Sequence, residues 1–324
     1  MLKGFKFREI YFVFIALIFA GCSKSEDKIH QGEVQQIEKN EMPKARALMA
    51  SRFSSFDDFK KRIKLDYVVD TNGGVDSLAH YSVFITYEDR GNKVVSVLES
   101  GITQGNIIEV RDGDMWDRAG LVYESPFVVA NRVELNKIYK LARRRPTLFG
   151  VGDVAFYDLA QACVEHISTD DLAYLYHRDS SDKGFINTFN HVTAQALITT
   201  MYSEEIADFV ADVHERYSMP ELITGKFTET QLTDLNSNPV DNYVDLINNE
   251  IGQELGLYLK DKYQIDNETI WTPVLLASYL NDMQEYYSWA FEMGLKPFNS
   301  EDEIIVTFCN KIKSVKLGVP YILE

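Results

Sequence analysis

The hydrophobic and polar positions of this chain follow two different periods, and the change between them divides it into regions. Residues 80–87 and 93–98 alternate as β-strands do, and the turn-forming sequence at 89–92 joins them into a predicted hairpin. Residues 106–110 are predicted as a third strand, and residues 46–64 as an amphipathic helix or helix pair.

From residue 131 onward, apolar residues recur every three to four positions, which is the period of an amphipathic helix. The predicted helices span 131–143, 151–165, 169–177, 184–202, 203–217, 239–262, 271–293 and 300–313. The pattern therefore predicts an α+β protein that is predominantly α, in which a small antiparallel β segment is followed by a multi-helix bundle.

The first 22 residues resemble a bacterial lipoprotein signal. A basic start precedes the apolar run Ile10–Ala20, and the sequence Phe-Ala-Gly-Cys ends at Cys22. The run is shorter than the roughly 20 apolar residues of a transmembrane helix. The resemblance implies that Cys22 becomes the N-terminus and carries fatty acyl chains such as palmitate. These chains would hold the protein on the outer membrane, either in the periplasm or at the surface. The alternative is an ordinary secretory signal that is cut elsewhere.

The rest of the chain divides into a tether and two folded regions. Residues 23–45 are polar, charged and without periodicity, which is typical of a tether. We predict a small α+β region at 46–125 and a helical domain at 126–324.

The net charge limits which partners the protein can bind, and the cysteine content limits whether it has a disulfide. A formal net charge of −16 argues against nucleic-acid binding and against attraction to anionic lipid headgroups. Cys163 and Cys309 both lie in apolar helical patterns, so they are either buried free thiols or a disulfide, which an oxidising compartment permits.

The predicted helix 203–217 carries a histidine among acidic residues. On a helical wheel, His214 lies beside the apolar stripe in line with Ala211, and Glu215 points roughly away from the core. Asp212 lies about 160° from His214, so one ion would not bind both side chains.

The predicted helix 239–262 has an unusual second row beside its apolar stripe. The row consists of Asp241, Asp245, Asn248, Gly252 and Gly256. Asp, Asn and Gly are poor helix formers, so we expect the row to meet another backbone or a bound species. The alternative is a polar face whose glycines serve helix packing.

Residues 184–256 resemble an uncharacterised domain family of bacteria and phages. Its members have an Arg-His helix start, then Asp-Ala-His-Glu, then Met-Asp-x-x-Asn-Asn-x-x-Gly. The matching residues in this chain are His191, Asp212, His214, Glu215, Asp245, Asn248, Asn249 and Gly252. The chain departs from the pattern at Asn190, Val213 and Val244, where the family has Arg, Ala and Met. The resemblance implies a site without naming a reaction.

Two hypotheses follow. In the first, His191, His214 and Asp245 bind a divalent metal such as zinc, and Asn248 orients a substrate for hydrolysis of an ester or phosphodiester. Without a metal, His214 would be a general base oriented by Asp245. The further candidates for this site are Asp212, Glu215, Asp241 and Asn249. In the second hypothesis, the lipoprotein is a non-catalytic structural or binding protein, and His191, His214, Asp245 and Asn248 form a buried hydrogen-bond network.

Overall fold

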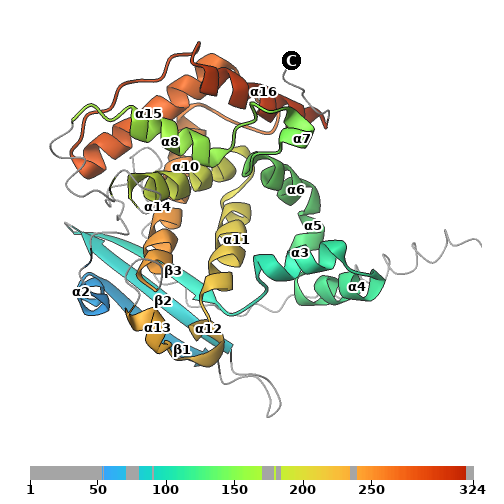
Figure 1. Ribbon diagram of the computed structural model, residues 1–324, viewed down its shortest axis with the longest axis vertical. Helices are drawn as coiled ribbons and strands as arrows, with labels where there is room; N and C mark the ends of the chain where they lie inside the picture. The colour runs from blue at the N-terminus through green and yellow to red at the C-terminus, as the bar shows by residue number, and fades with distance from the viewer. Residues whose placement is uncertain are drawn as a thin grey trace, which may run out of the picture. The chain divides into compact units, whose positions relative to one another are not determined.

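The computed structural model describes residues 55–70, 80–89, 91–169, 184–233 and 239–318, with the single residues 53 and 179. The signal at 1–22, the tether at 23–45 and most of the predicted helix 169–177 lie outside this part. The described part is mostly helical, with a three-stranded antiparallel sheet near its N-terminal side (Figure 1). This arrangement confirms the fold class predicted from the two periods.

The sheet has the order β1-β2-β3 and consists of Ile63–Asp70, His80–Asp89 and Asn92–Glu99. The hairpin of β2 and β3 was predicted, but β1 was not. The predicted helix 46–64 is too long, because α2 ends at Lys60 and the strand begins three residues later. Apolar residues then occupy every second position from Ile63, so one face of β1 is partly covered: Ile63 is buried, Leu65 and Tyr67 are half-buried and Val69 is exposed.

The predicted third strand at 106–110 is wrong, since these residues lie in helix α3 (Gln104–Asp112). A capping box starts this helix. The Thr103 backbone N–H donates to Asn106 Oδ1 at 2.8 Å, and the Asn106 N–H donates to Thr103 Oγ1 at 3.3 Å. These two bonds satisfy two of the backbone N–H groups that the first turn of a helix leaves without a partner.

The remaining elements are helices, joined mostly by short connections. They are α4 (Met115–Glu124), α5 (Pro126–Ala130), α6 (Arg132–Leu141), α7 (Pro146–Phe149), α8 (Phe156–Glu165), α10 (Phe185–Met201), α11 (Glu204–Glu215), η3 (Arg216–Ser218), α12 (Glu221–Thr224), α13 (Glu229–Thr233), α14 (Val240–Lys262), α15 (Pro273–Phe291) and α16 (Glu303–Leu317). Cys163 and Cys309 are buried free thiols in α8 and α16, and burial raises the pKa of each to about 12.

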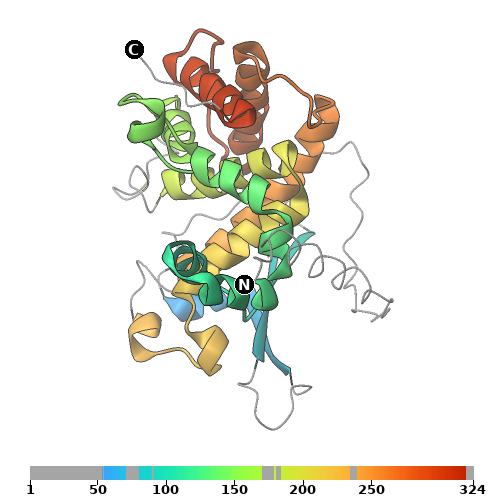
Figure 2. The same ribbon diagram turned by 90° about the vertical axis from the view of Figure 1, so that its right-hand side faces the viewer.

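Helix α14 is the element around which the described part is packed. It contacts α10, α11, β2 and β3, and the two views show the sheet near one end of this helix and α15 and α16 near the other (Figures 1 and 2). Both its apolar stripe and its polar row are buried. One hydrophobic core runs from Phe59 and Ile85 through Ile247 to Phe308, so it continues across the boundary at residue 125.

Helices α10 and α14 approach each other so closely that two positions accept only glycine. A Cβ atom on Gly252 would lie 2.7 Å from the Val192 carbonyl oxygen, and one on Gly256 would lie 2.6 Å from that of Ala196. The Thr200 hydroxyl also donates to the Gly256 carbonyl at 2.8 Å. The glycine half of the row therefore meets another backbone, as expected, and this contact fits equally the alternative in which the glycines serve helix packing.

Candidate metal centre

The polar residues at the N-terminal end of the α14 row face two side chains of α10. Asn187 Nδ2 donates to Asp245 Oδ1 at 2.9 Å and lies 3.4 Å from Asp241 Oδ1. One turn later, His191 Nδ1 lies 2.9 Å from Asn249 Oδ1, and its Nε2 lies 3.3 Å from Asp245 Oδ2. These contacts advance in the same direction along both helices, so the close contact at the glycines also sets the register of the polar groups.

Helix α11 supplies a third group from its last turn. Glu215 Oε1 lies 4.0 Å from His191 Nδ1, and the Glu215 residue is only 3% exposed. The prediction that Glu215 points away from the core is wrong. Its helix buries the face of Ala207, Ala211 and Glu215, which repeat every four residues, while Tyr217 is exposed. Small side chains let α11 lie against α14. The buried face of α11 is therefore turned away from the face that its larger apolar residues indicate.

His191, Glu215 and Asp245 together form a group of metal-ligand type. One potential ligand atom from each residue lies within 4.8 Å of the others. The three come from α10, α11 and α14, which are separate segments of the sequence. An imidazole nitrogen with two carboxylate oxygens suits zinc or manganese.

The contacts of the His191 ring favour a cation between its Nε2 atom and the Asp245 carboxylate. When Nδ1–H donates to Asn249 Oδ1, the neutral ring presents a lone pair at Nε2 to Asp245 Oδ2, which is also an acceptor. Two acceptors at 3.3 Å need a proton or a metal ion between them. A histidine that ligates by one nitrogen and donates from the other to an amide oxygen is the usual arrangement in metal sites.

The Glu215 carboxylate is itself incompletely satisfied. Within the described residues, neither its Oε1 nor the Asn249 Nδ2 has a hydrogen-bond partner. Burial raises the pKa of Glu215 to about 8, the nearby Asp241 and Asp212 carboxylates raise it further, and the Asn249 amide partly offsets the shift. A buried acceptor beside a histidine and a second carboxylate is therefore a position that favours a cation.

The acidic character continues along the contact between α11 and α14. Burial is the main cause that raises the pKa of Asp212 to about 7, of Glu250 to about 8 and of Glu254 to about 7, and neighbouring carboxylates add to each shift. Asp212 is also paired with Arg216 at 2.8 Å, so it is held away from the metal-ligand group.

The structure brings together part of the predicted set. His191 and Asp245 are neighbours, with Asn249 and Asp241 close by, and Asn248 is fully buried in the same helix. His214 is not in the group, because it is exposed and its Nδ1 lies 3.1 Å from Gln104 Oε1.

Among the described residues, Glu215 takes the place that the sequence analysis gave to His214 in the ligand set. Asn187 was missed as a site residue. Its signal was its position four residues before His191, on the same face of the helix.

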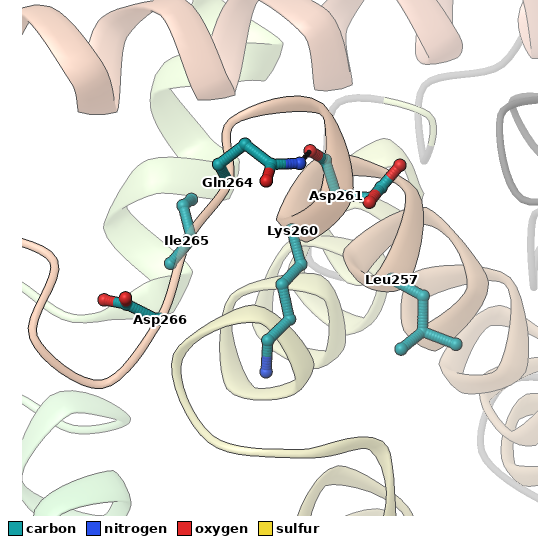
Figure 3. Close-up of a pocket in the computed structure, with 6 residues that line it drawn as sticks. All are labelled: Leu257, Lys260, Asp261, Gln264, Ile265 and Asp266. Atoms are coloured by element: carbon teal, nitrogen blue, oxygen red, sulfur yellow. Dashed lines mark hydrogen bonds between the residues drawn. The ribbon is translucent and has the colours of Figure 1, made fainter.

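A surface hollow of about 370 Å³ lies elsewhere, at the C-terminal end of α14 (Figure 3). Its lining includes Lys260, Asp261 and Asp266, whose side chains point in different directions in the close-up. Lys260 donates to the Tyr202 carbonyl at 3.3 Å. The hollow therefore lacks the convergence of titratable groups that distinguishes the three-helix cluster.

No family model, curated protein or solved structure matches this chain. Within the described residues, none of the helices has the length and apolar character needed to cross a membrane. The arguments for function therefore rest on the residues and their geometry.

Proposed function

We propose that this protein binds one divalent cation through His191, Glu215 and Asp245, and uses it to hydrolyse an ester or phosphodiester. The observation that carries the proposal is the convergence of three residues from three separate helices, with one potential ligand atom of each within 4.8 Å of the others. Two of the three are buried carboxyl groups beside one imidazole, a combination that a cation would stabilise.

The chemistry follows from the number and type of ligands. Three protein ligands leave a position for water in a tetrahedral site, and a metal-bound water is a nucleophile near neutral pH. Asn249 would hold the imidazole by accepting its Nδ1 proton, and Asn187 would orient the Asp245 carboxylate. Asp245 is thus held by the Asn187 amide of α10 before any ion arrives.

The test is cation binding by the chain from Ser23 onward, which retains the whole compact unit Lys39–Glu324. After chelation, titration with zinc or manganese should show one bound ion per chain. His191→Ala and Glu215→Gln should each weaken binding about tenfold or more. His214→Ala is the matched control and should leave affinity unchanged, because His214 contacts Gln104 instead.

Activity is measured on a chromogenic ester and a chromogenic phosphodiester with and without the bound ion. We expect hydrolysis that needs both the cation and His191. Absence of binding, or binding that survives both ligand variants, would refute the metal site. A bound ion with no turnover would refute only the hydrolytic step.

The second hypothesis, a buried network without catalysis, predicts a different result. A protonated His191 would then donate to both Asn249 and Asp245. Circular dichroism of the variants separates the two hypotheses, since a network predicts loss of stability without any ion being bound.

We also propose that the protein acts while lipid-anchored at Cys22 in the outer membrane of the cell envelope. The support is the basic start, the short apolar run and the Phe-Ala-Gly-Cys sequence. Several acyl chains give a stable anchor, whereas one chain gives only reversible binding.

A further inference from the structure

Helix α4 carries an apolar face that the described part of the protein does not cover. Met115, Trp116 and Tyr123 are 73%, 77% and 90% exposed, and Val122 is also exposed. At 100° per residue these four side chains lie on one side of the helix. Leu121, the buried residue of α4, points to the opposite side. The exposed face is therefore directed away from the rest of the fold.

The surroundings of α4 explain why its face is uncovered. The helix packs mainly against α3 and α5, two short helices, and α5 has no buried residue. Four large apolar side chains, two of them aromatic, thus share one exposed side of a single helix. An exposed apolar patch of this kind marks an interaction site more often than scattered single apolar residues do.

We infer that the α4 face, defined as Met115, Trp116, Val122 and Tyr123, rests in the interface of a zwitterionic phospholipid bilayer. Trp and Tyr have an apolar body and a polar end, which suits them to the headgroup level of a membrane. A helix with apolar residues on one side and polar residues on the other lies in the plane of this interface.

The lipid anchor and the charge select a bilayer as the partner, and to this extent the inference rests on the proposed function. The chain between Cys22 and Ser55 can reach at most on the order of 100 Å when fully extended, so an acylated Cys22 keeps α4 near a membrane. Helix α4 contains Asp117 and Glu124 against one Arg118, and the whole chain has a net charge of −16. Anionic headgroups would repel such a surface, which leaves neutral ones.

The test uses the chain from Ser23 onward, which lacks Cys22, and vesicles of phosphatidylcholine with phosphatidylethanolamine. We expect the protein to float with the vesicles, and less so when phosphatidylglycerol is added. The triple variant Met115→Ser, Trp116→Ser, Tyr123→Ser should reduce the floated fraction about fivefold or more. Because the three replaced side chains are exposed, the substitutions should leave the fold unchanged.

A second triple variant is the matched control. Val151→Ser, Ile270→Ser and Val274→Ser remove apolar side chains that are 97%, 76% and 65% exposed on other parts of the surface. Flotation should be unchanged in this variant. An equal loss in both triple variants, or no flotation of the unaltered chain, would overturn the inference.

Sedimentation velocity tests whether the α4 face binds a second copy of the protein instead of a bilayer. If the α4 variant changes only the self-association of the protein, the face binds a second copy and the bilayer assignment is wrong. Because the tested chain cannot be acylated, its result does not depend on whether Cys22 carries lipid.

Discussion

At the scale of single residues, the candidate site depends on one carboxyl group in an unfavourable position. Glu215 is buried and shares its surroundings with Asp241 and Asp212, and its pKa is about 8 instead of the usual 4.5. In the metal-free protein it is therefore protonated at neutral pH. Cation binding would displace this proton, so affinity should rise with pH.

The raised pKa also predicts how stability depends on pH. The folded state holds the Glu215 proton more tightly than the unfolded state, so this contribution is complete below pH 4.5 and is lost as pH rises through 8. In chelator, Glu215→Gln should gain stability relative to the unaltered protein by up to about 1.4 kcal/mol per pH unit between these values. Urea unfolding at pH 5, 6.5 and 8 measures the difference. Parallel pH profiles would show that Glu215 is not protonated in the folded state.

At the scale of elements, the site exists because α10 and α14 lie in near backbone contact. Gly252 and Gly256 permit that contact, and it brings together His191, which directly precedes Val192, and Asp245, which lies about two turns before Gly252. The two glycines lower the helix propensity of α14, and the packing they allow offsets that cost.

Substitution of a glycine separates packing from propensity. Gly252→Ala should lower the free energy of unfolding by about 1–3 kcal/mol, because its Cβ would lie 2.7 Å from the Val192 carbonyl oxygen. The control is Gly120→Ala in α4, where nothing lies within 4 Å of the new Cβ. That variant should gain up to about 1 kcal/mol from helix propensity alone. Equal effects in thermal unfolding would contradict the close approach.

At the scale of the whole molecule, the continuous core joins the sheet to the helices and one buried ion pair ties α16 to the loop before α8. Lys311 Nζ lies 2.9 Å from Asp153 and donates to the Arg143 and Val154 carbonyls at 3.0 and 2.6 Å. Burial lowers the pKa of Lys311, and Asp153 opposes that shift. The continuous core makes the α+β region and the helices one packed unit, and the ion pair adds a long-range contact between two helical segments.

The proposed anchor is a prediction at this scale as well. Cys22→Ser should abolish the incorporation of labelled palmitate. It should also move the protein from the membrane fraction to the fraction without membranes. Cys163→Ser is the control, because that thiol is buried in α8 and should not be acylated. Unchanged labelling of Cys22→Ser would show that the signal is not a lipoprotein signal.

Sequence periodicity was enough to predict the fold class and the longest helices, α10, α11, α14, α15 and α16, because residue periods of two and 3.6 reflect which face of each element is buried. The short helices α4, α5, α7, α12 and α13 were not predicted. The sequence also placed His191 and Asp245 on candidate faces. It did not place α3, whose start depends on the short-range bonds between Thr103 and Asn106.

Which acidic and imidazole groups meet depends on how the helices pack together. The helical wheel of α11 placed His214 at the site and Glu215 in solvent, but the small residues Ala207 and Ala211 are buried with Glu215 where α11 packs against α10 and α14. Which side of a helix is buried depends on the shape of its neighbour as well as on hydrophobicity, and that shape is set by residues far away in the chain. The exposed face of α4 is likewise visible only once its neighbours are in place.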